Sequence, residues 1–373
     1  MNILHLHKGL FGPGGGPYNS RSLALAQHRQ GHHVLAIGAP RRDKPQLPRF
    51  DFDSAAIDRG INGIGDLRRI VAERPFDVAH IHGLLRVEHS LWAREMNRAG
   101  IPYVVTPRNI FNPYTMQKRA GSKRDIPGWR LAKMAYLRLF DSSVMSNATA
   151  VHVLSPYEAN LAAQYGARRL FIHPYGIDPP PQPRETESRT SIEGPVRFLF
   201  LGRLDVFQKG LDLIADAFSR MDAEENFIVK VAGPPAKGSA EFLRDITAVV
   251  PPNALEMCGR LDGEPKEAAF AEAHYLLHPS RWEVMARTAR EALARGVPII
   301  ASEESNLGHW ARTEHLGFDV DLSSGSLEAA LRRAISGRGE HAMMAQNAQA
   351  FAKDHSWDHL ATALVEVYEG KST

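Results

Sequence analysis

The 373-residue chain repeats one pattern along most of its length, in which short apolar runs alternate with longer amphipathic segments. Such alternation is typical of a parallel β-sheet whose faces are covered by helices. In the first half, strands are predicted at residues 2–7, 33–37, 78–82, 103–106, 150–154 and 171–173. Helices are predicted at residues 18–30, 65–73, 87–98, 129–141 and 156–165. This half is therefore expected to form an α/β domain.

A proline-rich segment interrupts the alternation. Residues 178–183 read Asp-Pro-Pro-Pro-Gln-Pro and continue into a polar run, a composition typical of a linker between domains. The alternation then restarts, with strands predicted at residues 196–201, 227–232, 255–258, 275–278 and 298–301, and helices at 211–221, 240–249, 286–295 and 327–335. We therefore expect an N-terminal domain over residues 1–178, a linker over 179–195 and a C-terminal domain over 196–350.

The last segment, residues 351–373, has its own apolar period. Apolar side chains recur there at spacings of three and four, which predicts an amphipathic helix: Trp357, Leu360, Ala361, Leu364, Val365 and Tyr368. We expect this helix to pack back on the N-terminal domain. Because open α/β sheets bind ligands beyond the carboxyl ends of their strands, we expect the chemistry in a cleft that the two domains face.

Composition excludes several classes of protein. Hydrophobic residues make up 43% of the chain and charged residues 23%, as in folded globular proteins, so a disordered or collagen-like chain is excluded. Cys258 is the single cysteine, which excludes an internal disulfide and a cysteine-based zinc site. No run reaches the ~18 apolar residues of a membrane span, and no basic segment precedes the opening apolar run. We therefore expect a cytoplasmic protein without a signal peptide.

Charge is divided unevenly along the chain. Residues 1–178 carry 24 Lys and Arg against 13 Asp and Glu, a net charge of +11, and the remainder carries 21 against 29, a net charge of −8. This asymmetry predicts that the first half meets something anionic. Nucleic acid is not expected, because the whole chain has a net charge of only +3 and no nucleic-acid-binding motif.

Glycines follow the first predicted strand. The turn between residues 9 and 17 holds Gly12, Gly14, Gly15 and Gly16 directly before a predicted helix, where backbone N–H groups can approach a phosphate. A dinucleotide fingerprint would need Gly or Ala where this chain has Pro17, so the turn departs from that fingerprint. A turn without a ligand is the alternative.

A second turn, at residues 202–210, pairs glycines with cations. Arg203 and Lys209 lie six residues apart between a buried strand and a helix, with Lys209 expected in the first helical turn. A cation near a helix N-terminus is unfavourable unless an anion offsets it, so the arrangement favours a diphosphate ligand. A solvated basic loop is the alternative.

Two glutamates eight residues apart mark a third region. Glu283 is expected in the loop that enters a helix, and Glu291 two turns inside that helix. Carboxylates in such places can accept hydrogen bonds from vicinal hydroxyls, one pair on a hexose and one on a ribose. Either glutamate alone would be interpreted as an ordinary acid at a helix start.

Taken together, these motifs resemble the group 1 retaining glycosyltransferases, a GT-B family that includes glycogen synthase and bacterial mannosyltransferases, and most closely its bacterial polysaccharide members. The resemblance covers nearly the whole chain and implies two Rossmann-like αβα domains. It implies that Arg203, Lys209 and Glu283 are catalytic. It also implies the following donor-binding residues: Gly15, Gly16, Gly202, Arg203, Lys209, Glu283, Val284, Met285, Ala286 and Glu291.

The resemblance also has weaker implications and three departures. The nucleotide base is expected near Gly233, Pro234, Gly259 and Arg260, and the acceptor near His82 and Arg108. The family usually has Gly where this chain has Val284, which is expected to restrict the backbone. Arg108 stands where many members have His. Residues 302–306 replace a usual glycine pair.

Metal binding is not expected. Two Asp-x-Asp strings, at residues 51–53 and 319–321, lie far from the predicted phosphate-binding turns. His5 with His7 and His80 with His82 form pairs on strands, and a pair without a third ligand is a poor metal site. Such histidines are expected to be hydrogen-bonded within the sheet, and no cofactor is expected.

Basic residues gather at residues 108–138, interleaved with aromatic and apolar side chains. The cations are Arg108, Lys118, Arg119, Lys123, Arg124, Arg130, Lys133 and Arg138. This surface is compatible with an anionic membrane, and a solvated helix face is the alternative.

The resemblance implies a metal-independent enzyme that moves a hexose from a nucleotide-diphosphate sugar to a glycan or lipid-linked acceptor, with retention, in polysaccharide or glycolipid synthesis. A nucleotide-sugar epimerase and a non-catalytic nucleotide-sugar binder are the alternatives.

Overall fold

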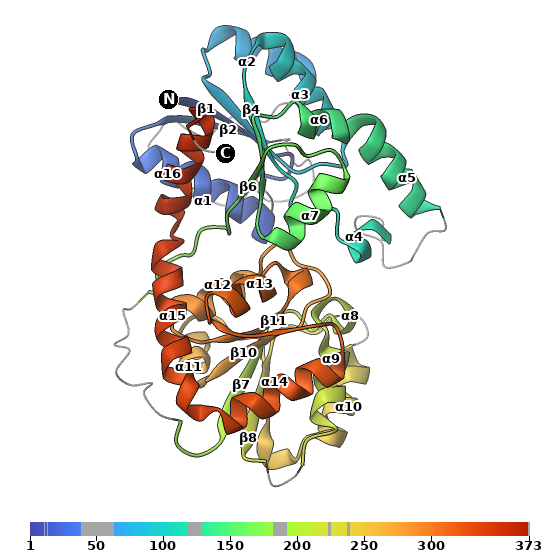
Figure 1. The fold of residues 1–373 in the computed structure, drawn as a ribbon, viewed down its shortest axis with the longest axis vertical. Coiled ribbons are helices and arrows are strands. Elements are labelled where there is room, and N and C mark those ends of the chain that lie inside the picture. The colour runs from blue at the N-terminus through green and yellow to red at the C-terminus, as the bar shows by residue number, and fades with distance from the viewer. Residues whose placement is uncertain are drawn as a thin grey trace. The chain divides into compact units, whose positions relative to one another are not determined.

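The computed structural model describes residues 1–10, 12, 14–38, 63–117, 128–181, 192–222, 225–236 and 239–371 (Figure 1). The chain forms two compact units. Unit 1 comprises Met1–Gly176 together with His355–Thr373, and unit 2 comprises Ile177–Asp354. Within the described ranges, no helix combines the length and the hydropathy that crossing a bilayer requires.

Unit 1 is built on a six-stranded parallel sheet. Its strands are β1 (Asn2–Leu6), β2 (His33–Ile37), β3 (Val78–His82), β4 (Tyr103–Thr106), β5 (Ala150–Val153) and β6 (Leu170–Ile172). They lie in the order β2-β1-β3-β4-β5-β6. Every residue of β3, β4 and β5 is buried, as expected for parallel strands covered on both faces. The six predicted strands are confirmed to within a residue at most ends.

The helices of unit 1 are α1 (Gly15–Arg29), α2 (Ile64–Glu73), α3 (Val87–Ala99), α4 (Pro113–Gln117), α5 (Trp129–Tyr136), α6 (Ser142–Ser146), α7 (Pro156–Gln164) and α16 (Trp357–Tyr368). The single helix predicted at residues 129–141 is wrong in detail. A turn of π-helix, η1 (Leu137–Asp141), separates α5 from α6, and the apolar period alone does not reveal such a change in hydrogen bonding.

Unit 2 repeats the architecture. Its strands are β7 (Val196–Leu201), β8 (Phe227–Ala232), β9 (Leu255–Gly259), β10 (Tyr275–His278), β11 (Ile299–Ser302) and β12 (Gly317–Val320). They are parallel and lie in the order β12-β11-β10-β7-β8-β9. The sequence did not predict β12, because a four-residue edge strand that begins with glycine has too few apolar positions to show a period.

The helices of unit 2 are α8 (Val206–Lys209), α9 (Leu211–Phe218), α10 (Ser239–Val249), α11 (Gly263–Glu272), α12 (Arg287–Ala294), α13 (Gly308–Thr313), α14 (Ser324–Ser336) and α15 (His341–Asp354). Short 3₁₀ turns are η3 (Pro252–Ala254), η4 (Glu303–Ser305) and η5 (Arg338–Glu340). Aromatic side chains of β7 and β10, among them Phe198 and Tyr275, fill the core of this unit.

Each sheet contains one point where the strand order reverses. In unit 2, the chain runs from β7 outward to β9 and then returns to place β10 on the other side of β7. In unit 1, the corresponding point lies between β1 and β3. At such a point the loops after two adjacent strands turn in opposite directions and leave a crevice, where open α/β sheets bind ligands.

The C-terminal helix α16 packs on unit 1 beside α1 (Figure 1). Trp357 lies against Tyr175 and Gly176, with the rings of Trp357 and Tyr175 6.1 Å apart. A Cβ atom added to Gly176 would lie 2.6 Å from the backbone Cα of Trp357. At the other end of α16, the amide of Gln27 donates to the hydroxyl of Tyr368. The helix is therefore part of the core of unit 1.

We expect Gly176→Ala to lower the free energy of unfolding by about 1–3 kcal/mol, the usual cost of an overpacked core, because the methyl group would push α16 away from unit 1. Urea unfolding of the purified protein measures this difference. Gly65→Ala in α2 is the matched control, because a Cβ atom there meets no heavy atom within 4 Å. Equal stability of the two variants would show that α16 is not held at this contact.

Candidate functional site

Lys209 and Glu283 meet where the strand order of unit 2 reverses. Lys209 follows β7 through the one-turn helix α8, and Glu283 lies in the loop after β10. The ammonium group of Lys209 donates to Oε1 of Glu283, and the two side chains are only 13% and 17% exposed. The structure thus brings together a cation and a carboxylate that are 74 residues apart in the sequence.

Gln208 extends this pair to Arg203. Its amide nitrogen lies 3.3 Å from Oε1 of Glu283, and its amide oxygen accepts a hydrogen bond of 3.0 Å from the Arg203 guanidinium. Arg203 is otherwise well exposed and lies 3.6 Å from Asp205. Sequence reasoning missed Gln208, because a glutamine beside Lys209 carries no signal until the loop after β10 is placed next to it.

The turn that holds Lys209 differs from the prediction. Lys209 is not in the first turn of a long helix but is the last residue of α8, which Asp205 caps by accepting from the backbone N–H of Gln208 at 3.1 Å. Gly210 then takes a left-handed conformation with φ of 67°, where a Cβ atom would overlap the carbonyl oxygen of Pro279. The cation therefore stands at the carboxyl end of a helix, which favours positive charge.

Arg281 ties the two loops together. Its guanidinium makes two hydrogen bonds, of 2.7 and 2.6 Å, to the carboxylate of Asp212 in α9, and a third of 2.7 Å to the carbonyl of Phe207. It also lies 4.3 Å from the centre of the Phe207 ring. A paired arginine of this kind fixes geometry more firmly than a lysine could, so the loop after β10 is held against α8.

Val284 fits its position. It does not take a positive φ, so the expected restriction by a β-branched side chain is not a strain here. The amide of Asn306 donates to the backbone carbonyls of Val284 at 2.8 Å and Glu283 at 3.3 Å. Asn306 is itself left-handed, with φ of 63°. The segment that lacks the usual glycine pair thus supplies the side chain that holds the Glu283 loop.

The remaining residues expected at the donor lie around α12. Met285 and Ala286 have buried side chains, so they can present only backbone groups to a ligand. Glu291 lies inside α12 and is buried, and its carboxylate accepts from Lys266 at 3.0 Å and lies 3.1 Å from Arg287. Glu283 precedes the helix and Glu291 is within it, as the spacing predicts.

The turns expected near the nucleotide base adjoin the same strand ends. Gly233 has φ of 153°, and a Cβ atom there would overlap the carbonyl oxygen of Gly202, so the loops after β7 and β8 approach closely. The Gly233 N–H donates to the Gly259 carbonyl at 2.6 Å. Pro234 is exposed, and Arg260 is exposed and paired with Asp262. None of these side chains distinguishes one base from another.

In unit 1, α1 begins with Gly15 and Gly16. Its N-cap residue is Gly14, which has no side chain with which to cap the helix. A Cβ atom at Gly16 would overlap the guanidinium of Arg108, which therefore lies directly over the first turn. That guanidinium also donates to Nε2 of His7 at 2.7 Å. The two elements that sequence reasoning assigned to donor and acceptor are thus in contact within this unit.

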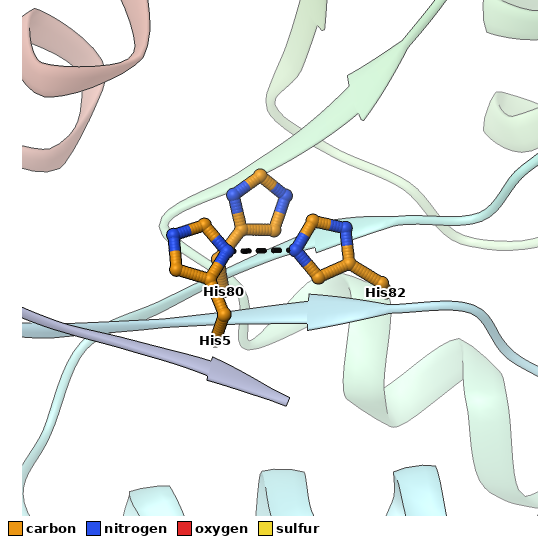
Figure 2. Close-up of side chains that lie close together, drawn as sticks. All are labelled: His5, His80 and His82. Carbon is orange, nitrogen blue, oxygen red and sulfur yellow. Dashed lines mark hydrogen bonds between the residues drawn. The ribbon is translucent and has the colours of Figure 1, made fainter. Parts of the chain in front are cut away.

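Histidines gather beneath this region. Figure 2 shows His5 on β1 with His80 and His82 on β3, and their ring nitrogens are all within 4.8 Å of one another. The sequence predicted separate pairs and missed this group of three. The rings of His80 and His82 lie 4.2 Å apart with planes only 11° apart. Parallel, offset rings cannot both point their in-plane lone pairs at one ion, so this arrangement does not fit a metal.

Positive charge dominates this part of unit 1. Burial lowers the pKa of His7 well below its ordinary value, and the charges of Arg108, Arg21 and Arg86 lower it further. Burial similarly lowers the pKa of His82, with a smaller effect from Arg108. Both rings are therefore neutral, and the potential around them favours an anion.

Some predictions fall elsewhere. The string at residues 51–53 and the basic residues Lys118, Arg119, Lys123 and Arg124 lie outside the described residues. In the second string, Asp319 pairs with Arg312, and Asp321 accepts hydrogen bonds from Ser323. Those two carboxylates have structural partners.

Comparison with known proteins identifies the family. The profile described as glycosyl transferases group 1 matches residues 182–351, and the profile described as glycosyl transferase 4-like domain matches residues 14–176. A D-inositol 3-phosphate glycosyltransferase from Xylanimonas cellulosilytica is 25% identical over 320 residues, which make up 79% of this chain and 72% of the relative.

Solved structures agree on the fold. Sucrose-phosphate synthase from Thermosynechococcus elongatus superposes with a TM-score of 0.68 at 16% identity, over 99% of each chain. The Anabaena protein HepE, solved in complex with UDP, has a TM-score of 0.71 at 16% identity, over 99% of this chain and 100% of its own. The predicted GT-B class is therefore confirmed, and the chain belongs to the group 1 glycosyltransferases.

Proposed function

We propose that the chain transfers a hexose, with retention and without a metal, from a nucleotide-diphosphate sugar to a hydroxyl of a glycan or a lipid-linked acceptor. The observation that carries this proposal is the contact of Lys209 with Glu283, extended by Gln208 to Arg203, at the strand-order reversal of unit 2. Nucleotide ligands bind beyond strand ends at such points.

The nature of the donor is supported by a structural relative. HepE from Anabaena has been solved with UDP and with UDP-glucose, and its fold matches the whole of this chain. In this chain, Lys209 and Arg203 would hold the diphosphate, and Glu283 would accept hydrogen bonds from the sugar hydroxyls. Glu291, with its carboxylate already fixed by Lys266 and Arg287, would accept from the ribose. The same loops offer further backbone groups to the donor, those of Gly202, Val284, Met285 and Ala286.

The charges available support the proposal of metal independence. A departing diphosphate gains negative charge as the glycosidic bond breaks, and fixed cations stabilise that charge without reorganisation. Lys209 and Arg203 in unit 2 supply two such cations, and the uncapped first turn of α1, with Gly15 and Gly16, offers backbone N–H groups. In this proposal, these groups would neutralise the diphosphate as Mg²⁺ does in other nucleotide-dependent enzymes.

Retention is proposed because Glu283 and Arg108 do not suit the roles of nucleophile and base. A covalent intermediate needs a carboxylate behind the anomeric carbon, whereas Glu283 is held by Lys209 and assigned to the sugar hydroxyls. Inversion needs a base, and the guanidinium of Arg108, which stands where many relatives have His, offers only hydrogen-bond donors. The remaining route is attack from the side of the leaving group, with the departing phosphate taking the proton of the attacking hydroxyl.

Two alternatives differ in what they release. A nucleotide-sugar epimerase would use the same donor site and return a nucleotide sugar. A non-catalytic binder would return the donor unchanged. Transfer, or slow hydrolysis, releases free nucleotide diphosphate, which neither alternative accumulates.

We expect the protein, incubated with UDP-, GDP- and ADP-hexoses, to release nucleotide diphosphate from one of them, at an unchanged rate after dialysis against EDTA. NMR of the glycoside formed should show the anomeric configuration of the donor. Activity that needs added Mn²⁺ or Mg²⁺ would contradict metal independence. An inverted product would contradict the mechanism, and no release from any donor would favour a binder.

We expect Arg203→Ala and Lys209→Ala each to lower turnover by on the order of 10²-fold, the usual loss of one preorganised electrostatic donor. Lys230→Ala on β8 is the control, because that lysine also pairs with carboxylates, those of Glu256 and Glu272, without being at a strand end. Steady-state release of nucleotide diphosphate measures all three variants. Turnover of both site variants within threefold of the parent would contradict the assignment.

Membrane association is a second part of the proposal, with the acceptor held at the inner face of the plasma membrane of the producing cell. On α5 and η1, Leu131, Leu139 and Phe140 are exposed by 70%, 72% and 47%. Arg130 and Arg138 are exposed on the same two elements. Exposed apolar side chains among cations are typical of helices that lie on anionic lipid.

We expect the protein to co-sediment with vesicles that contain anionic lipid, and less so as ionic strength rises, because each cation near such a surface contributes about 1 kcal/mol that salt screens. Leu139→Asp should weaken this binding, and Leu91→Asp, on the exposed face of α3, is the control. Equal binding to neutral vesicles, or none to either kind, would point to a soluble acceptor.

A further inference from the structure

Eight residues of unit 1 form one continuous hydrogen-bond chain. It runs from the backbone carbonyl of His173 through His152, Thr106, His80, Tyr368, Gln27 and His5 to His82. All the side chains between the two ends are buried, and so is that of His82. They come from β1, β3, β4, β5, α1 and α16. The hydrogen-bond chain therefore runs from strand to strand and includes the C-terminal helix.

The carbonyl end fixes the direction of every bond. A carbonyl oxygen can only accept, so Nε2 of His152, 2.9 Å from the His173 oxygen, carries a proton. In a neutral ring Nδ1 is then an acceptor, and it accepts from the Thr106 hydroxyl at 3.2 Å. Because that hydroxyl has one proton, it must in turn accept from Nε2 of His80 at 2.7 Å.

The same reasoning continues through α16. Nδ1 of His80 accepts from the Tyr368 hydroxyl at 2.7 Å, so the Tyr368 oxygen accepts from the amide nitrogen of Gln27 at 3.2 Å. The Gln27 oxygen then accepts from Nε2 of His5 at 2.7 Å. Nδ1 of His5 is left as an acceptor.

The chain ends on one nitrogen of His82. Nε2 of His82 donates to Nδ1 of His5 at 2.9 Å (Figure 2), so the lone pair of the ring is on Nδ1. That atom is buried and has no hydrogen-bond partner within the described part of the chain. A buried acceptor without a donor costs about 1–3 kcal/mol, so its presence calls for a partner that the described residues do not supply.

The proton positions are defined in this way only if the histidine rings are neutral, and they are. Burial lowers the pKa of His152 to about 3 and that of His5 to about 4, and it lowers those of His80 and His82 well below the ordinary value. Burial also raises the pKa of Tyr368, so its hydroxyl keeps its proton. Each member therefore has one defined proton position.

A neighbouring ring offers the opposite polarity. Arg108 can only donate, so Nε2 of His7 accepts from it and Nδ1 of His7 carries the proton. This second Nδ1 is also buried without a partner in the described residues. His7 follows β1 and His82 ends β3, and their ring centres are 6.0 Å apart. One ring offers a donor and its neighbour an acceptor, the pair of functions that a hydroxyl group satisfies.

We propose that Nδ1 of His82 accepts a hydrogen bond from a hydroxyl of a polyhydroxyl acceptor, and that His5, Gln27 and Tyr368 are positioning residues that keep this nitrogen unprotonated. The inference rests on the proposed transferase function. The hydroxyl bound is not the attacking one, because that proton goes to the departing phosphate.

The tautomer can be observed directly. Long-range ¹H–¹⁵N NMR of protein labelled with ¹⁵N-histidine should show the His82 proton on Nε2, with the signal assigned from its loss in His82→Asn. Tyr368→Phe removes the link between His80 and Gln27, and it should convert this signal to a mixture of tautomers. Tyr103→Phe, which removes another buried hydroxyl of unit 1, should leave the signal unchanged. A parent His82 protonated on Nδ1 overturns the inference whatever the activity.

Activity tests the contact itself. With the donor that the nucleotide-sugar assay identifies, octyl glucoside, octyl mannoside and octyl galactoside serve as acceptors, and hydrolysis of the donor by water serves as the internal control. His82→Ala should lower transfer by tenfold or more while hydrolysis stays within threefold. His82→Asn, whose side-chain oxygen replaces Nδ1 as an acceptor, should recover most of the transfer.

The outcomes separate this inference from the proposed function. Equal loss of transfer and hydrolysis in His82→Ala, or hydrolysis by the parent without transfer to any glycoside, overturns the contact with an acceptor hydroxyl. No release of nucleotide diphosphate from any donor contradicts the proposed function and with it the contact. In that case the NMR experiment still decides whether the hydrogen-bond chain fixes the position of the proton on the His82 ring.

Discussion

The reversal of strand order in each sheet is the constraint on which both sites depend. A parallel sheet that grows in one direction sends every crossover helix to the same side, and only a return to the first strand opens a crevice between two loops. In unit 2, that return places β10 beside β7 and brings Glu283 to Lys209. In unit 1, it places β3 beside β1, and the adjoining β4 carries Arg108 to His7.

The loops at these points approach one another so closely that some positions admit only glycine. Gly210 and Gly233 each stand where a Cβ atom would overlap a backbone carbonyl of the neighbouring loop. Asn306 takes the left-handed conformation, which costs asparagine little conformational energy. Its side-chain amide donates to the backbone carbonyls of Glu283 and Val284. Arg281 fixes the other side of the same loop through Asp212. The loops therefore meet through close backbone approaches as well as through side-chain contacts.

Periodicity predicted the strands that carry the site. Residues 196–201 are apolar except for Arg197, as expected of a strand that is buried on both faces, and this run was predicted as a strand. The edge strand β12 was missed because it is short and only half buried. Lys209 was placed in the wrong part of a helix because a one-turn helix has no period to detect. Local pattern thus locates apolar strands and long helices, and it misses a half-buried edge strand and a helix of one turn.

Contacts between residues that are distant in the sequence were not predicted either. Gln208, Asn306 and Arg281 have no signal in a single sequence, since each acts on a residue that becomes its neighbour only after the sheet forms. The histidines on β1 and β3 were visible as two pairs, but the parallel register that aligns His5 with His80 makes them one group. An error in register of one residue would have sent the same side chains to opposite faces.

The C-terminal helix joins the fold of unit 1 to the polarity of its buried chain. Without Tyr368, His80 and Gln27 would have no common partner, and nothing would connect the carbonyl of His173 to His82. The helix reaches this place because the chain returns to unit 1 at His355, after unit 2 ends at Asp354, and Trp357 then packs against Gly176. Docking of an apolar face, a non-directional interaction, therefore determines a directional property, the position of one proton on the ring of His82.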